Sequence, residues 1–281
     1  SLRRFRSLLL LVILSPFFLV FYCQAQTSLP SPGLVGYWHN WNTTSAPYIQ
    51  LDQVDSRYTI IDLAFAVPRS GTDYDMVFTP AMVTEATLKT QIQTLQSQGR
   101  KVIISIGGAN SPIALSNTTE RDQFVLSMGN IISNYGFDGI DIDLEGSSLS
   151  VSSGSTIANP VDVPIVNMIN AIKSILSNYN TSTGKKLLLT MAPETAFVQG
   201  GMSAYSGVWG AYLPLIHALR DQLDLLHVQL YNSGTMYVYH CCAVRNELPA
   251  GQRCQTRNIY IAANRRLSNF WGDDDMVHQL G

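Results

Sequence analysis

Short runs of apolar and β-branched residues alternate with longer amphipathic stretches along most of the chain. The apolar runs predict strands, at residues 34–38, 59–66, 101–106, 139–144, 186–191 and 225–230. The longer stretches predict helices, at residues 84–98, 119–134, 163–178 and 210–222. Strands that alternate with helices indicate βαβ units and a parallel sheet, and strands this apolar indicate a sheet covered on both faces.

The predicted strands start about 38 residues apart on average, which favours an α/β fold of the (β/α)₈ TIM-barrel type over small doubly wound units. In such a barrel the functional side chains stand at the C-terminal ends of the strands. Polar or aromatic groups close four of the predicted strands, at Trp38-His39-Asn40, Gly107-Gly108-Ala109-Asn110, Pro193-Glu194 and Tyr231-Asn232. We therefore expect one pocket built from distant segments.

The pattern changes after Gly234. Two further βα units need about 75 residues, and fewer remain, with one strand candidate at residues 258–262. We expect a catalytic barrel domain at residues 34–235 and a divergent tail at residues 236–281, so that the barrel is incomplete at its C-terminus and strands seven and eight are not recognisable. A barrel missing a wall leaves strand edges open, so we expect instability or low activity until that wall is restored.

The first 25 residues have the layout of a targeting segment. Arg3, Arg4 and Arg6 precede an apolar run at residues 8–22, and small or polar residues follow it. This predicts a secretory signal peptide at residues 1–25 and a short linker at residues 26–33. A membrane anchor is the alternative, although the run is short for a span. The expected localisation is secreted and extracellular, with no membrane association after the signal is removed.

Composition narrows the choice of partners. The chain has 281 residues, a formal net charge of -2 and 14% charged residues. This length can bury a large core, and the absence of a basic stripe argues against nucleic-acid binding. We expect a monomer.

Four acidic residues lie close together in the segment of residues 135–145, which reads Tyr-Gly-Phe-Asp-Gly-Ile-Asp-Ile-Asp-Leu-Glu. Asp141, Asp143 and Glu145 alternate with aliphatic residues, so a strand places all three carboxylates on one face. Inside a barrel this face points inward, where burial and mutual repulsion raise at least one pKa and keep a proton near neutral pH. A retained proton is what a general acid needs.

Two other interpretations fit an alternating acidic strand: a solvated face of an open sheet, and a calcium site. A solvated face fits poorly with the bulky aliphatic residues and with Gly136 and Gly139, and a calcium site would need further oxygen ligands at loop spacing. We favour catalysis and expect no metal and no cofactor.

The pattern Asp138-x-x-Asp141-x-Asp143-x-Glu145 resembles the signature of family 18 glycoside hydrolases, the chitinases, in their bacterial and fungal branch. Other segments resemble the family's remaining strand motifs in the right order: Gly36-Tyr37-Trp38, Ala64-Phe65-Ala66, Ser105-Ile106-Gly107-Gly108, Met191-Ala192-Pro193-Glu194 and Gln229-Leu230-Tyr231-Asn232. The resemblance covers about residues 33–234.

The resemblance implies a retaining, endo-type chitinase that hydrolyses β-1,4-linked N-acetylglucosamine in chitin or chito-oligosaccharides. Catalysis would be substrate-assisted, with the substrate's own acetamido oxygen as the nucleophile. Glu145 would protonate the glycosidic oxygen, and Asp143 would hold the acetamido N–H. Asp141 would share a proton with Asp143 and help it turn toward Glu145, and Tyr231 would align the acetamido oxygen.

The resemblance also assigns supporting roles. Substrate binding is expected from Tyr37, Phe65, Met191, Gln229 and Asn232, and structural support from Asp138, Gly107, Gly108 and Glu194. Among other residues, Trp38 is the favoured tryptophan for contact with a sugar, and His217 and His227 are expected to be core or helix-face histidines. The alternative functions are a catalytically impaired, lectin-like chitin-binding protein and an inactive fragment. The intact acidic row with Glu145 favours the enzyme.

Overall fold

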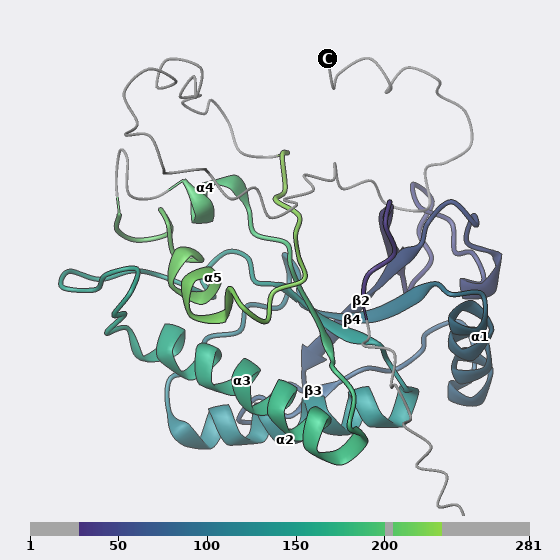
Figure 1. Cartoon of the computed structure of the whole chain (residues 1–281), viewed down its shortest axis with the longest axis horizontal. Helices are drawn as coiled ribbons and strands as arrows, with labels where there is room; N and C mark the ends of the chain where they lie inside the picture. The colour runs from purple at the N-terminus through teal and green to yellow at the C-terminus, as the bar shows by residue number, and fades with distance from the viewer. Residues whose placement is uncertain (1–27, 200–204, 232–281) are drawn as a thin grey trace, which may run out of the picture.

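The computed structural model describes residues 28–199 and 205–231 (Figure 1). The predicted signal peptide, Asn232 and the predicted tail lie outside the described residues. Within the two described ranges, no helix combines the length and the apolar character that a membrane crossing requires.

The order of elements confirms the predicted alternation. The strands are β1 Val35–His39, β2 Ile60–Pro68, β3 Met76–Val77, β4 Lys101–Gly107, β5 Gly139–Asp143, β6 Leu188–Met191 and β7 Leu225–Leu226. The helices are η1 Leu51–Gln53, α1 Glu85–Ser97, α2 Thr118–Tyr135, α3 Val163–Thr183, α4 Thr195–Val198 and α5 Leu213–Leu219. Each predicted strand and helix has a counterpart here. The short elements β3, η1 and α4 were not expected, and β7 is shorter than its apolar run.

The sheet has the order β1-β2-β4-β5-β6-β7 with parallel neighbours, and β3 pairs antiparallel with β2. Tyr37 on β1 and His227, just after β7, belong to opposite edges of this sheet. Their ring centroids nevertheless lie 5.9 Å apart. The sheet therefore curls into the wall of a (β/α)₈ barrel, as predicted, and the predicted loss of strands seven and eight concerns residues outside the described ranges.

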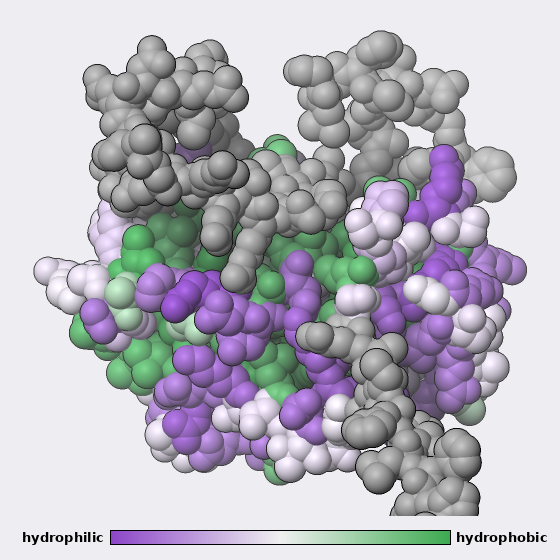
Figure 2. Space-filling model, in the orientation of Figure 1, coloured by the Kyte–Doolittle hydropathy of each residue, from purple (hydrophilic) through white to green (hydrophobic). Residues whose placement is uncertain are grey.

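The two faces of the curled sheet carry separate cores. Aliphatic residues such as Ile104, Ile140 and Leu189 face outward and share the main core with helix residues such as Phe124 and Met128. This core buries the inner sides of α1, α2, α3 and α5, which surround the sheet in Figure 1. Figure 2 shows apolar side chains at the centre and left of the same view and hydrophilic ones along its lower rim and right side.

A second, smaller cluster fills the concave side of the sheet. Its members are Val35, Ile60, Ile103, Leu188 and Leu225. Each comes from a different strand, and two residues after each of them a polar residue follows on the same face of that strand. Because side chains alternate between the faces of a strand, the residues two positions further along also point into the barrel.

The turn that leads into β5 is held by its own sequence. Asn117 caps the start of helix α2, where its side chain accepts a hydrogen bond from the Glu120 backbone N–H, and Gly136 caps the end in the left-handed conformation with a φ of 71°. Asp138 then accepts hydrogen bonds from the Val102 backbone N–H at 2.9 Å and from the Gln96 side chain at 3.0 Å. The predicted supporting role of Asp138 is therefore to fix the N-terminal end of β5 against β4 and α1.

Candidate active site

Above the small apolar cluster, each of the six parallel strands or its extension contributes one inward polar side chain. This polar layer consists of Tyr37, Asp62, Ser105, Asp141, Thr190 and His227, all of them buried. The register places Tyr37 opposite Asp62, and Asp141 between Ser105 and Thr190. The parallel register thus gathers polar groups from distant parts of the sequence around one carboxylate.

Asp141 is that carboxylate, and four side chains donate hydrogen bonds to it. Tyr37 Oη and Ser105 Oγ lie 2.5 and 2.7 Å from Oδ2. Thr190 Oγ1 and His227 Nε2 lie 2.6 and 3.0 Å from Oδ1. A carboxylate has about four acceptor positions, so its oxygens are fully occupied.

These contacts lower the pKa of Asp141. Burial by itself raises the pKa of a carboxyl group, but here the positive charge and hydrogen bond of His227, with the bonds from Thr190 and Tyr37, lower the pKa of Asp141 overall. Burial and the neighbouring carboxylates raise the pKa of the Tyr37 hydroxyl well above 10.0, so that it stays protonated and donates. In the structure Asp141 accepts hydrogen bonds from four side chains, and the proton that the resemblance has it share with Asp143 stays a prediction.

Asp143 and Glu145 lie further toward the mouth of the barrel, and one amide joins them. Gln229 Nε2 lies 2.8 Å from Asp143 Oδ1, 3.2 Å from Glu145 Oε1 and 3.0 Å from the Ala192 carbonyl oxygen. Asp143 is 4% exposed and Gln229 is 2% exposed, whereas Glu145 is partly open to solvent. The acid that would meet the substrate is thus the more accessible of the two.

Asp143 and Glu194, on either side of Glu145 in charge contact with it, have pKa values above those of ordinary surface acids. Burial raises the pKa of Asp143 well above 3.8, and the charges of Asp141 and Glu145 raise it further. Burial and the charge of Glu145 also raise the pKa of Glu194. Glu194 makes no capping hydrogen bond to the helix that follows it, so its position favours a role beside the acidic row over one as a helix cap.

Two glycines let the neighbouring strand approach the acidic row. A Cβ at Gly107 would lie 2.3 Å from the Asp143 carbonyl oxygen, and one at Gly108 would lie 2.8 Å from the Phe65 ring. The Gly108 backbone N–H donates to that same carbonyl at 2.8 Å. Both glycines have positive φ, 92° and 75°. They therefore support the end of β5, as expected, and Phe65 packs over them beside Tyr37.

Tyr212 also holds the end of β5, and the sequence analysis missed it. Its hydroxyl accepts a hydrogen bond from the Leu144 backbone N–H at 2.6 Å and donates one to the Ile142 carbonyl oxygen at 3.0 Å. Burial raises the pKa of this hydroxyl well above 10.0. Tyr212 thereby fixes the backbone on both sides of Asp143.

Two expected sugar contacts are wrong. Met191 is fully buried in the main core between sheet and helices, because it stands one residue from Thr190 and so faces outward. Trp38 is 1% exposed, and its indole N–H donates to the Ile49 carbonyl oxygen at 3.0 Å. Tyr231 is 44% exposed, on the segment that carries Gln229, and Asn232 lies outside the described residues.

Aromatic rings line the mouth instead. Trp41, which the sequence analysis passed over, is 37% exposed and stacks on His39 with ring centroids 4.7 Å apart. Its ring also lies 6.3 Å from Phe65. Exposed flat rings near a polar row offer apolar faces to a ligand. Two surface hollows, of about 490 and 460 Å³, lie outside the barrel against α3 and include none of these residues.

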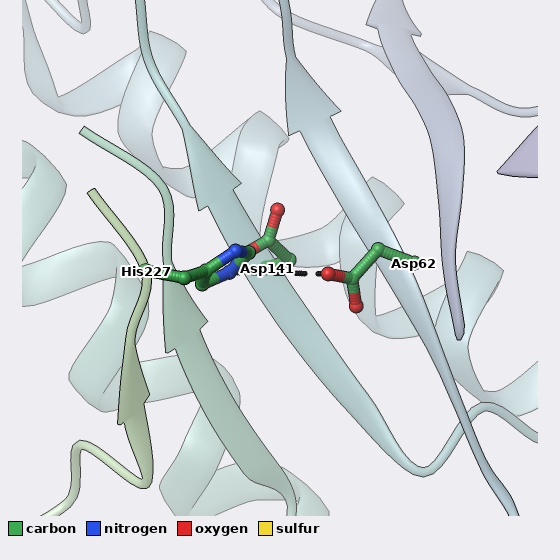
Figure 3. A group of neighbouring side chains, drawn as sticks. All are labelled: Asp62, Asp141 and His227. Atoms are coloured by element: carbon green, nitrogen blue, oxygen red, sulfur yellow. Dashed lines mark hydrogen bonds and ion pairs between the residues drawn. The ribbon is translucent and has the colours of Figure 1, made fainter. Parts of the chain in front are cut away.

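His227 was expected to be an ordinary core histidine, and Asp62 was not considered. Both face Asp141 across the polar layer (Figure 3), and the His227 ring is 3.0 Å from Asp141 and 3.8 Å from Asp62. Among the described residues these three could surround a metal ion, since their ligand atoms all lie within 4.8 Å of one another. The direct bond between His227 and Asp141 favours a hydrogen-bonded group. Because side chains alternate between the faces of a strand, His227, two residues before Gln229, is expected to point into the barrel as Gln229 does. This pattern could have identified His227 from the sequence.

The curled parallel sheet and a row of inward carboxylates at the end of β5 define a barrel hydrolase of the glycosidase type. The chain matches the family model "Glycosyl hydrolases family 18" over residues 33–263, and it belongs to this family. The match continues past residue 234, where the resemblance of the sequence motifs ended.

Known relatives agree with this assignment. Chitinase Chi52 of Paenibacillus xylanexedens and chitinase D of Niallia circulans are each 50% identical to the chain, over 72% and 75% of its length. A family GH18 chitinase from Chromobacterium violaceum superposes with a TM-score of 0.63 at 40% identity, over 75% of the chain. The matches span only 38% and 40% of the two relatives and 54% of the solved chain.

Proposed function

We propose that the chain is a retaining chitinase that cleaves β-1,4-linked N-acetylglucosamine in chitin or chito-oligosaccharides with Glu145 as the general acid. The observation that carries this proposal is the bridge of Gln229 between buried Asp143 and partly exposed Glu145 at the mouth of the barrel. The chitinases among its relatives, named above, support the substrate class.

In the proposed reaction, Glu145 gives its proton to the glycosidic oxygen as the C1–O bond breaks. The acetamido carbonyl oxygen of the substrate attacks C1 and forms a cyclic oxazolinium ion. Asp143 accepts a hydrogen bond from the acetamido N–H and faces the positive charge that develops there, while Tyr231 orients the acetamido oxygen. Water, deprotonated by Glu145, then opens the ring at C1 with net retention.

The raised pKa of Asp143 supports this division of roles. Asp143 binds a proton more tightly than an ordinary aspartate, because it is buried beside Asp141 and Glu145. In the proposed complex the oxygens of Asp143 face the acetamido group, and their partial negative charge favours a cationic intermediate over a neutral substrate. Such a preference for the charged species is what catalysis requires.

The proposal is tested with matched chito-oligosaccharides that are fully acetylated or fully deacetylated. We expect hydrolysis of the acetylated oligomer and a rate lower by at least about 10²-fold on the deacetylated one, because glucosamine offers no nucleophile. Nuclear magnetic resonance of the first product reports retention of the anomeric configuration, and product lengths report endo-type action. Equal rates on both oligomers would contradict the substrate-assisted mechanism.

A lectin-like protein is the alternative function. It predicts that the chain binds acetylated oligomers without cleaving them. The intact row from Asp141 to Glu145, with Gln229 in contact, favours the enzyme.

We further propose that the chain is secreted, which suits a polymer that lies outside the cell. The basic and apolar N-terminal pattern of residues 1–25 supports this. N-terminal sequencing of the protein exported by an expression host tests it, and an N-terminus near Gln26 is expected.

A further inference from the structure

A buried group of Asp62, Asp141 and His227 lies beneath the proposed active site (Figure 3). The side chains come from β2, from β5 and from the segment after β7. Asp62 and Asp141 are 0% exposed and His227 is 1% exposed, so none of them meets the substrate directly. Their chemistry can reach the reaction only through Asp141, which stands two residues before Asp143.

Asp62 is the unusual member of this group. Neither of its carboxyl oxygens has a hydrogen-bond partner among the described residues, and its nearest charged neighbour is His227 Nε2 at 3.8 Å. An ionised carboxylate without a partner is very costly in a dry interior, so such a group keeps its proton. Burial indeed raises the pKa of Asp62 well above 3.8, and the charges of Asp141 and Asp143 raise it further.

His227 is the group's single basic side chain. The titratable groups that face it in the described structure are Tyr37, Asp62 and Asp141. Of the four donors to Asp141, the other three are hydroxyl groups, which supply hydrogen bonds but no charge. A protonated His227 beside an anionic Asp141, with protons on Asp62 and Asp143, leaves these four residues with no net charge. Neutrality is the state that burial favours.

We propose that His227 is a positioning residue for the hydrolysis, whose positive charge keeps Asp141 ionised beneath Asp143 over the working pH range. The inference rests on the proposed function, since it assigns His227 to the same reaction. His227 acts through Asp141 and touches no reacting atom.

The test compares His227→Gln with the parent chain, by measuring kcat/KM on an acetylated chito-oligosaccharide across pH. Glutamine places an N–H at about the reach of Nε2 and carries no charge. Without the positive charge Asp141 binds its proton more tightly, so the pH below which activity is lost should rise by about one unit or more. The change is expected at low pH, with a smaller loss near the optimum.

His217→Gln is the matched control. His217 lies exposed on α5, and its substitution should leave the pH profile within about 0.3 units of the parent. If His227→Gln lowers kcat at every pH without moving the low-pH limb, His227 has only a packing role and the proposal is wrong.

A second measurement does not depend on how well the variant folds. ¹⁵N nuclear magnetic resonance of the histidine-labelled parent chain reports the protonation of each ring. His227 should be doubly protonated throughout the pH range in which the chain is active, and a neutral ring in that range overturns the proposal. If the parent chain cleaves no acetylated oligomer, the proposed function fails, and this measurement still decides the charge of His227.

Discussion

At the scale of the residue, two side chains of the same type differ because of what surrounds them. Asp141 receives four hydrogen bonds and the charge of His227, and its pKa is lowered. Burial raises the pKa of Asp143, the repulsion of Asp141 and Glu145 raises it further, and the hydrogen bond from Gln229 offsets only part of this. Glu145, beyond both of them, is partly open to solvent, as the proposed proton donor must be. Environments that separate the pKa values of neighbouring acids are typical of acid–base catalysis.

Glu145→Gln tests the assigned donor. The amide keeps the shape of the side chain and the contact with Gln229, but it has no proton to give. We expect kcat to fall by about 10²- to 10⁴-fold, while binding of an acetylated oligomer, measured by calorimetry, stays within a few-fold of the parent.

The matched control for that variant is Glu85→Gln on α1. Glu85 pairs with Lys89 on the outer surface of the molecule, and its substitution should not change turnover. Turnover by Glu145→Gln within a few-fold of the parent would identify another residue as the proton donor.

At the scale of the element, the end of β5 is fixed from two sides. Tyr212 bonds the backbone on both sides of Asp143, and the Gly108 N–H bonds the Asp143 carbonyl oxygen. The close approach of β4 requires a residue without a side chain at Gly107. The positions of the carboxylates therefore depend on backbone contacts as well as on their own strand.

Gly107→Ala tests this dependence, with Gly99→Ala as its control. Both glycines have positive φ, 92° and 81°, but a Cβ at Gly99 meets nothing within 4 Å. We expect Gly99→Ala to lower the free energy of unfolding by about 1–2 kcal/mol through backbone strain alone. Gly107→Ala adds a collision with the Asp143 carbonyl, costing about 1–3 kcal/mol more, and moves the acidic row.

Urea unfolding and chitinase assays measure both effects. Only Gly107→Ala should lose activity, by about 10²-fold for a shift of about 1 Å. Equal stability and activity of the two alanine variants would show that β5 adjusts without consequence.

At the scale of the whole molecule, the barrel interior is layered. Apolar residues fill its lower part, a polar layer with two aspartates and a histidine lies above them, and the acidic row opens toward the mouth. Within the polar layer, the buried carboxyl group of Asp62 lowers the free energy of unfolding near neutral pH, because the proton that it keeps in the folded chain opposes folding there.

Asp62→Asn tests this loss of stability. The pKa of Asp62 is raised in the folded chain, so above about pH 4 the unfolded chain releases a proton that the folded chain keeps. The parent therefore loses stability relative to the variant as pH rises, by about 1.4 kcal/mol per pH unit up to the folded pKa. Below about pH 4 both forms are neutral, and the relative gain of the variant should vanish.

Urea titrations of the parent and of Asp62→Asn near both pH values measure this difference. Asp73→Asn, in an exposed turn, is the control that should show no such pH-dependent gain. A variant that is less stable than the parent at neutral pH would mean that Asp62 is ionised and paired with His227.

The sequence by itself determined the elements and the faces of its strands. Alternation along residues 139–145 put three carboxylates on one side and the aliphatic residues on the other, and the structure keeps that division. These are local properties, since a strand repeats every two residues whatever lies beside it. The same rule, applied to residue 191, would have turned Met191 away from the site, where motif resemblance placed it.

Only the tertiary structure decided which side chains meet. His227 and Asp141 are 86 residues apart in sequence, and Tyr212 reaches Ile142 across 70. No local pattern encodes the register between strands or the curl that brings opposite edges of the sheet together. The partners of Asp141, and with them the direction in which its pKa shifts, follow from that curl, because a carboxylate's pKa depends on the groups packed around it and not on its neighbours along the chain.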